Sequence, residues 1–106
     1  MGKENQLTNY KSDLFEDLKD PEYAALYLAN VMEDGSSEEF LLALRDVAEA
    51  RKMSAVAEAS NLNRESLYKM LSESGNPRLN SLRAVLASVG LRLSVKPVFA
   101  VHRDRK

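Results

Sequence analysis

Six polar or charged side chains follow one another closely in the stretch "NLNRESLYKML", and their types suit the recognition of nucleic acid. They are Asn63, Arg64, Glu65, Ser66, Tyr68 and Lys69. An arginine can bind a guanine edge through two hydrogen bonds, and a glutamate can accept a hydrogen bond from cytosine. Serine, tyrosine and lysine can contact phosphates or bases. Carried on one helix, these side chains would form a surface that reads base pairs.

The elements that must position these side chains are two short helices joined by a turn at residues 60–62. Helices of about six to nine residues are unstable alone, so each must be fixed by packing. A helix-turn-helix achieves this, with the first helix crossing the DNA backbone and the second lying in the major groove. Asn61 stands where the turn favours a left-handed backbone, which asparagine tolerates better than most residues. The apolar residues that suit the shared core of this pair are Val56, Ala57, Leu62, Leu67, Met70 and Leu71.

Two longer helices are predicted before this pair from their capping residues. Asp20 is an N-cap candidate, and Pro21 follows it at the first helical position. Gly35 is expected to end this helix in a left-handed conformation. Ser36 and Glu39 have the spacing of a capping box, which opens a second helix ending near residue 52.

Capping residues also predict the bounds of the remaining helices. Ser54 is expected to cap the first short helix, and Asn63 the second, which runs to about residue 72. After a turn-rich connection, Asn80 is expected to cap a fifth helix, which Gly90 stops. The fold class predicted from these elements is mainly α, a five-helix domain that contains a helix-turn-helix.

The apolar period changes from helical to two after Gly90, and this predicts a C-terminal β-strand. Pro97 cannot donate a hydrogen bond to a ladder, so the strand ends or becomes an edge there. A lone strand must pair with the N-terminal segment or with a second copy of the chain. A two-fold homodimer follows from the second option. Its predicted interface residues are Leu91, Leu93, Val95 and Val98.

The length of 106 residues and the apolar content of 44% suit one domain with a modest core. We expect this domain to span residues 1–106. Residues 1–12 are expected to be disordered or to add a short element, and residues 97–106 to form a basic tail.

Composition argues against several classes of function. The chain has no cysteine and one histidine, His102, so no disulfide framework or zinc cluster is expected. We expect no metal, no cofactor and no catalytic residue, because no paired groups suit nucleophilic or acid–base chemistry. His102 is expected to be a solvated tail residue. No apolar run approaches the roughly 18 residues of a membrane span, so a soluble, cytoplasmic protein is expected.

Charge is distributed very unevenly along the chain, although the net charge is only -1. Residues 1–50 hold four basic and twelve acidic side chains, a net charge of -8. Residues 51–106 hold eleven basic and four acidic side chains, a net charge of +7. This asymmetry predicts one surface for a polyanion and another for a basic partner. A chance segregation of charges among solvated helix faces is the alternative interpretation.

Three segments of the sequence together resemble a known family. They are "LKDPEYAALYLANVMEDG", "EEFLLALRDVAEARKMS" and "NRESLYKMLSESGNPRLNSLRAVLASVGLRLSV". They resemble the probable addiction-module antidote proteins, antitoxins related to HigA with a lambda-repressor-like helix-turn-helix of the Cro/repressor type. The resemblance covers roughly residues 13–95. It departs from the family at Asn61, where glycine is usual, at Asn80, where serine or threonine is common, and in the tail beyond Val95.

The resemblance implies the antitoxin of a type II toxin-antitoxin system. Such a protein neutralises a basic RelE/ParE-like (HigB-like) toxin and, as a homodimeric repressor, binds double-stranded operator DNA and regulates transcription of its own operon. The acidic N-terminal helices are the expected toxin-binding surface. The predicted DNA-contacting residues are Ser54, Asn63, Arg64, Glu65, Ser66, Tyr68, Lys69, Asn76 and Arg78.

Other functions stay open at this point. The chain could be a protein-interaction module in which the helix-turn-helix is only scaffold, or a solitary regulator without a cognate toxin. Binding to DNA separates the first alternative from a repressor, because a specific complex with operator DNA weakens steeply with salt.

Overall fold

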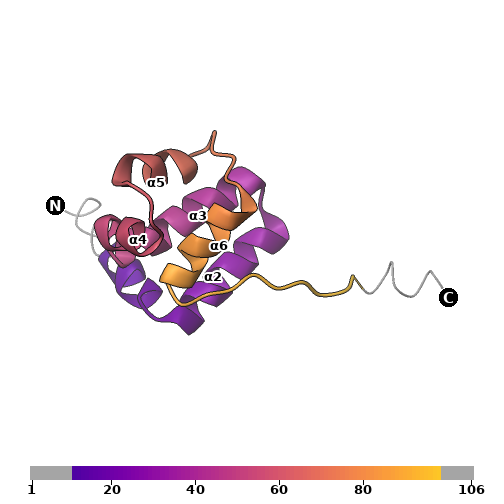
Figure 1. The fold of residues 1–106 in the computed structure, drawn as a ribbon. Helices are drawn as coiled ribbons and strands as arrows, with labels where there is room; N and C mark the ends of the chain where they lie inside the picture. Colours follow the sequence, from indigo (N-terminus) through magenta and orange to yellow (C-terminus); the bar gives the residue numbers. More distant parts are fainter. Residues whose placement is uncertain (1–10, 99–106) are drawn as a thin grey trace.

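The computed structural model describes residues 11–98, and in this part of the chain all regular structure is helical (Figure 1). Residues 11–18 form a helical segment, whereas a short element was predicted only as one alternative for residues 1–12. The helices that follow it are α2 (Pro21–Asp34), α3 (Ser37–Ala50), α4 (Met53–Ala59), α5 (Arg64–Met70) and α6 (Leu79–Ser88). The predicted mainly α class is therefore confirmed, and the α4–turn–α5 pair fits a helix-turn-helix. The predicted number of five helices is wrong, because residues 11–18 add a sixth helix to the described part of the chain.

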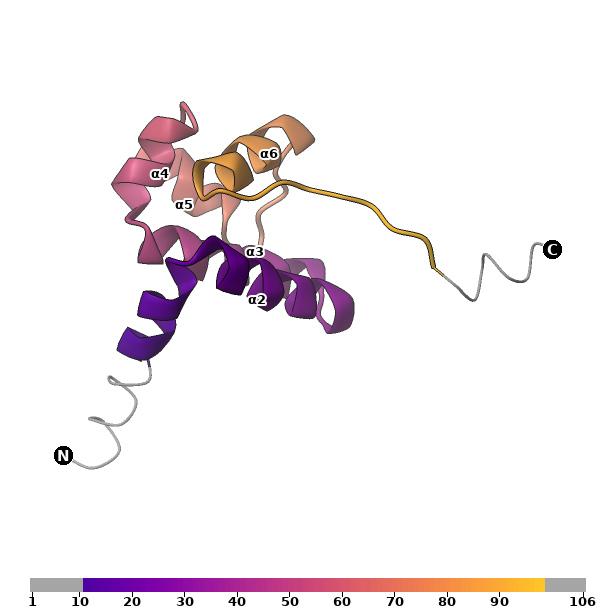
Figure 2. The same cartoon turned by 90° about the horizontal axis from the view of Figure 1, so that it is seen from below.

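The core lies around α3, which packs against α2 and α4, while α4 also contacts α5 and α6 (Figures 1 and 2). Both short helices contribute to this core, as their apolar spacing predicted. Since neither helix has enough length to be stable alone, the burial of their apolar side chains is what holds α4 and α5 in place. The largest fully buried side chains are Leu18, Leu44, Val47, Val56, Leu67, Leu71, Val85 and Val89.

The predicted starts of α2 and α3 are confirmed by hydrogen bonds. The Asp20 carboxylate accepts from the Glu22 backbone N–H at 3.1 Å. The Ser36 hydroxyl accepts from the Glu39 N–H at 3.1 Å, and the Glu39 carboxylate accepts from the Ser36 N–H at 2.8 Å. These bonds satisfy backbone donors that a helix start leaves without partners.

The predicted left-handed conformation of Gly35 is wrong. Its backbone is extended, with a φ of -106° and a ψ of -177°. Space explains the glycine instead, because a Cβ atom there would lie 2.6 Å from the Glu39 carboxylate and 2.8 Å from the Val31 carbonyl oxygen. Gly35 thus allows the chain to pass close to the two helices that it joins.

The predicted capping roles of Ser54 and Asn80 are also wrong. Helix α4 begins at Met53 after Lys52, and α6 begins at Leu79 after Arg78, without a side-chain capping bond in either case. Lys52 adopts a left-handed φ of 80°, which turns the chain directly from α3 into α4. Ser54 and Asn80 therefore lie inside their helices rather than ahead of them.

The predicted C-terminal β-strand is not present, since residues 91–98 form an extended coil with no ladder to any other described residue. Leu91 and Leu93 pack against the helical core, whereas Arg92 between them is exposed. At these positions the two-residue period reflects alternate contact with helices and not pairing with a strand, and Val95, the next apolar residue of the pattern, is 98% exposed. The predictions for residues 1–10 and 99–106, including the tail residue His102, lie outside the described part of the chain.

Candidate nucleic-acid interface

The turn between α4 and α5 has a defined hydrogen-bond pattern. Asn61 is left-handed, with a φ of 61°, as predicted. The Leu62 N–H donates to the Ala57 carbonyl at 2.8 Å, and the Asn61 N–H donates to the Glu58 carbonyl at 3.1 Å. This pair of bonds is a Schellman motif, which closes a helix through one left-handed residue. The backbone at the turn therefore sets the direction in which α5 leaves α4.

The start of α5 is held by Asn63, whose side-chain oxygen accepts from the Ser66 N–H at 2.7 Å. The predicted capping role of Asn63 is thus confirmed. This bond occupies one lone pair of the oxygen, so both N–H donors of the Asn63 amide are left for another molecule. Asn63 itself is exposed.

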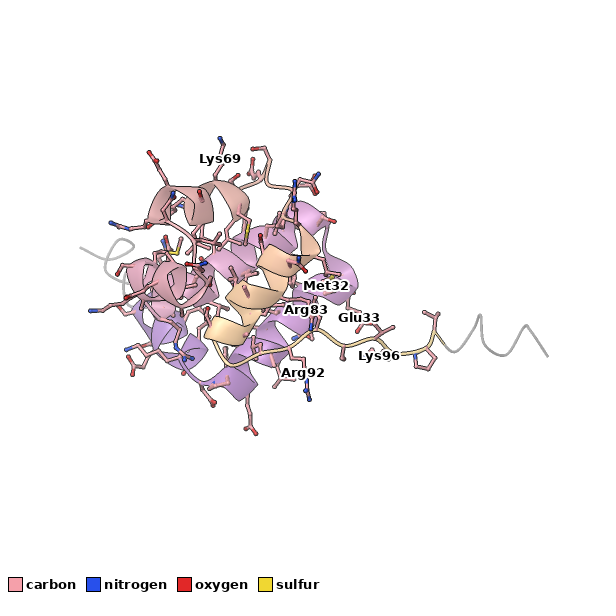
Figure 3. The ribbon with its side chains drawn as sticks, in the orientation of Figure 1. Met32, Glu33, Lys69, Arg83, Arg92 and Lys96 are labelled. Atoms are coloured by element: carbon pink, nitrogen blue, oxygen red, sulfur yellow. The ribbon has the colours of Figure 1, made fainter. Side chains whose placement is uncertain are left out.

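One face of α5 is anchored and the opposite face is open to solvent. Leu67 is 0% exposed, and Leu71 just after the helix is equally buried. Figure 3 shows Lys69 pointing away from the body of the domain. The predicted DNA-contacting residues of α5 that are exposed are Arg64, Glu65, Ser66 and Lys69.

Tyr68 differs from these residues because its ring is only half exposed and packs against the core. Two guanidinium groups lie over the ring: that of Arg45 from α3 is 5.0 Å from the ring centroid, and that of Arg64 is 5.8 Å from it. Arg45 also pairs with Glu49 at 3.5 Å. Arg45 is not among the predicted DNA-contacting residues, since its only local signal in the sequence is the helical spacing to Glu49, which is usual on a solvated face.

The predicted residues outside α5 divide into two groups. Asn76 and Arg78 are exposed on the connection before α6, and they line one surface hollow of about 450 Å³ with Ser66 and Lys69. The structure thus gathers two cations and two hydrogen-bonding side chains on one side of α5. Ser54 is exposed on the first turn of α4 but does not line this hollow.

The predicted dimer residues also divide. Leu91 and Leu93 line a second hollow of about 340 Å³ between α2, α6 and the C-terminal coil, whose lining includes Met32 and Leu86. Val95, in contrast, is 98% exposed, and Val98 is mostly exposed. The inner pair is therefore partly packed within one chain, whereas the outer pair is exposed to a second molecule.

Acidic side chains are frequent on α2 and α3, and of these two helices α2 lies on the side of the domain away from α5 (Figure 1). Asp34, Glu39 and Asp46 line a third hollow, of about 500 Å³, between these two helices. The Tyr27 hydroxyl donates to the Asp46 carboxylate at 3.0 Å within it. Helix α2 itself carries Glu22, Glu33 and Asp34 and no lysine or arginine.

Within residues 11–98, no helix combines the length and the apolar character needed to cross a bilayer. The same residues hold no group of three or more acidic or histidine side chains arranged to bind a metal ion.

Comparisons with known proteins give two findings. A family model described as "Probable addiction module antidote protein" matches residues 8–97. A protein of Haemophilus influenzae (strain ATCC 51907 / DSM 11121 / KW20 / Rd) is 37% identical over 84 residues, which cover 79% of this chain and 87% of that protein. Its name is "Uncharacterized protein". No solved structure matches the chain significantly.

Proposed function

The chain belongs to the family of probable addiction module antidote proteins, and on this basis we propose that it is an antitoxin that also binds operator DNA. The family itself indicates the antitoxin role in an addiction module and a cognate toxin as partner. The DNA-binding part of the proposal rests on one observation. A short helix, α5, is anchored by buried leucines and turns a polar, partly cationic face to solvent.

The exposed residues suit two kinds of DNA contact. Arg64, Glu65 and Ser66, at the start of α5, have the side chains that discriminate base edges in the major groove. Lys69 and Arg78 lie on the rim of the 450 Å³ hollow, where they suit contacts to phosphates. Helix α4 would then cross the backbone, as the first helix of such a pair does.

Repression through a homodimer is the second part of the proposal. Two copies would present two α5 helices to major grooves about 34 Å apart, and the operator would then be an inverted repeat. The exposed Val95 and Val98 support a contact between copies. This contact would form through coil segments, since residues 91–98 form no strand.

The toxin is proposed to be a basic protein of the RelE/ParE-like (HigB-like) class, bound at the acidic surface of α2 and α3. The charge of this surface supports the proposal, because Asp34, Glu39 and Asp46 would attract a basic partner. Such a complex belongs in the cytoplasm, where DNA and toxin are both present. The proposal includes no enzymatic activity and no cofactor.

Selection of DNA sequences tests the proposal. The wild-type chain would be used to enrich 20-base-pair duplexes from a random pool, and the affinity for the enriched duplex would be measured at several salt concentrations. We expect a specific complex whose affinity falls steeply with salt, because phosphate contacts release counterions. If no sequence is enriched even at low salt, the DNA-binding proposal is refuted.

Two substitutions then separate base contacts from phosphate contacts. Arg64→Ala is expected to weaken binding by about 1 to 3 kcal/mol, roughly 5- to 150-fold, and to relax the preference at one base position. Lys69→Ala is expected to weaken the binding of all DNA sequences alike. It should also lower the slope of log affinity against log salt concentration by about 1. Arg92→Ala, an equally exposed arginine on the C-terminal coil, is the matched control and should change neither property. An unchanged base preference in Arg64→Ala would show that Arg64 does not read bases.

A protein-interaction module remains the second candidate, because the acidic α2–α3 surface needs no DNA to hold a basic partner. The same selection experiment discriminates the two, since this candidate predicts no enriched duplex. A solitary regulator would enrich a duplex but would have no toxin to bind.

A further inference from the structure

The ring of Tyr68 connects two helices, α5 with its proposed DNA-contacting face and the neighbouring α3. Tyr68 lies four residues after Arg64, so both side chains occupy one face of α5. The Arg64 guanidinium is 5.8 Å from the ring centroid, and the Arg45 guanidinium of α3 is 5.0 Å from it. Both distances lie within the range of about 6 Å over which a cation is attracted to the face of an aromatic ring.

The two arginines differ in their other partners. Arg45 pairs with Glu49 on the same helix, so its charge is already balanced within α3. In the described chain, no carboxylate lies within ion-pair distance of Arg64. Arg64 is therefore held by the ring alone and keeps its guanidinium donors for another molecule, since attraction to a ring face uses none of them.

The ring is a stable support because it does not depend on Arg64 for its own position. It packs against the hydrophobic core beside the buried Leu67, and Arg45 holds it from α3. A free arginine side chain has many rotamers, and confining it before binding lowers the entropy lost when it contacts a base. A partly buried ring in this position is better placed to orient Arg64 than to reach into a groove itself.

We infer that Tyr68 is a positioning residue for sequence recognition: its ring, held by Arg45, orients Arg64 toward one base pair and does not itself read DNA. This inference rests on the DNA-binding function proposed above. It replaces the direct contact that the sequence predicted for Tyr68. It also adds a residue of α3 to the recognition surface.

Three replacements of Tyr68 test the inference on the duplex enriched by the wild-type chain. Tyr68→Phe keeps the ring and removes the hydroxyl. Incorporation of 3,4,5-trifluorophenylalanine at position 68 keeps the ring shape but depletes the negative charge of its face. Tyr68→Leu keeps an apolar side chain without a ring. Affinities are compared with those of Arg64→Ala on the enriched duplex and on its single-base variants.

We expect Tyr68→Phe to bind within about twofold of the wild type. The proteins with the trifluorinated ring and with Tyr68→Leu are expected to bind the duplex about two- to fivefold more weakly than the wild type. This is the range of a cation–ring contact at an exposed site. The loss should be confined to the base position that Arg64→Ala also relaxes. Combined with Arg64→Ala, Tyr68→Leu should cause no further loss, because the ring then has no arginine to orient.

Three results would overturn the inference. If Tyr68→Phe loses as much affinity for the duplex as Tyr68→Leu does, the hydroxyl contacts DNA directly. Equal affinity of the phenylalanine and trifluorophenylalanine proteins would show that the ring face attracts no cation during binding. A loss that persists in the Arg64→Ala background would show that Tyr68 acts independently of Arg64.

Folding and function are separated within the same experiment. Circular dichroism gives the folded fraction of each variant, and affinities are calculated for the folded protein only. The fluorinated ring preserves shape, so it tests the inference even if Tyr68→Leu is poorly folded. Failure of the wild-type chain to enrich any duplex refutes the DNA-binding proposal and the inference together. An enriched duplex that all Tyr68 variants bind equally refutes the inference alone.

Discussion

Leu67 offers a direct test of how α5 is held, because α5 has too few residues to be stable without packing. The Leu67 side chain is 0% exposed in the core. Leu67→Ala removes three carbon atoms, and at about 0.8 kcal/mol for each the lost transfer free energy is about 2.4 kcal/mol. A cavity adds to this loss, so we expect the free energy of unfolding to fall by about 3 to 5 kcal/mol.

This loss is large compared with the total stability of a domain of this size, which is about 5 to 15 kcal/mol. The melting temperature should fall by more than 10 °C, since about 1 kcal/mol corresponds to roughly 4 to 8 °C. Leu79→Ala is the matched control, because Leu79 is 62% exposed at the first position of α6. Its effect should lie within about 0.5 kcal/mol of zero.

Urea unfolding followed by far-ultraviolet circular dichroism measures both variants. The slope of the unfolding free energy against urea should be the same in each, so that the midpoints compare stability alone. If Leu67→Ala and Leu79→Ala differ by less than about 1 kcal/mol, core burial does not anchor α5. The proposed presentation of Arg64 by a fixed helix would then lose its basis.

Two further predictions concern the local structure that frames the site. Asn61→Val should lower the free energy of unfolding by about 1 to 2 kcal/mol, because a β-branched residue is strained at a φ of 61°. Asn61→Gly should not destabilise the protein, and thermal unfolding distinguishes the two variants. Ser36→Ala should lower the free energy of unfolding by about 1 kcal/mol, because it removes the cap of α3. The control Ser12→Ala, on the exposed face of the helical segment 11–18, should lower it by less than about 0.5 kcal/mol. Equal losses of stability in chemical denaturation would contradict the capping role.

Local hydrogen bonds explain which helix starts could be predicted from the sequence. Asp20, Ser36 and Asn63 each cap a helix through a bond to a backbone N–H two or three residues ahead. Such bonds involve neighbouring residues, so residue type and spacing are enough to indicate them. Asn61 was predictable for the same reason, since the left-handed residue of a turn depends on its own backbone preference.

Ser54 and Asn80 failed as predicted caps because α4 and α6 begin one residue before each of them without any side-chain bond. The start of α4 follows from the left-handed Lys52, a conformation that lysine rarely adopts and that no sequence pattern indicates. The strain of this conformation must be offset by tertiary packing. The buried apolar side chains that follow it on α4 include Met53 and Val56.

The error at the C-terminus has a different cause. The alternation of Leu91, Leu93 and Val95 indicates that alternate side chains face the same way. It does not indicate whether the backbone forms hydrogen bonds to another strand. A second Schellman motif, with left-handed Gly90 and a bond from the Leu91 N–H to the Leu86 carbonyl at 2.8 Å, directs the coil along α6. Leu91 and Leu93 then pack partly buried against the helices, and the backbone of an exposed coil can hydrogen-bond to water without a strand partner.

The opposite charges of the two halves of the chain become compatible with DNA binding once the fold separates them. Helix α3 lies between α5 and α2, which occupy opposite sides of the domain (Figures 1 and 2). A helix with its side chains is about 10 Å across, and the screening length at physiological salt is about 8 Å. The acids of α2 therefore weaken only slightly the attraction of a phosphate to Lys69 or Arg78. A basic toxin at the hollow lined by Asp34, Glu39 and Asp46 would contact residues other than those proposed to contact DNA, so a net charge of -1 does not argue against either partner.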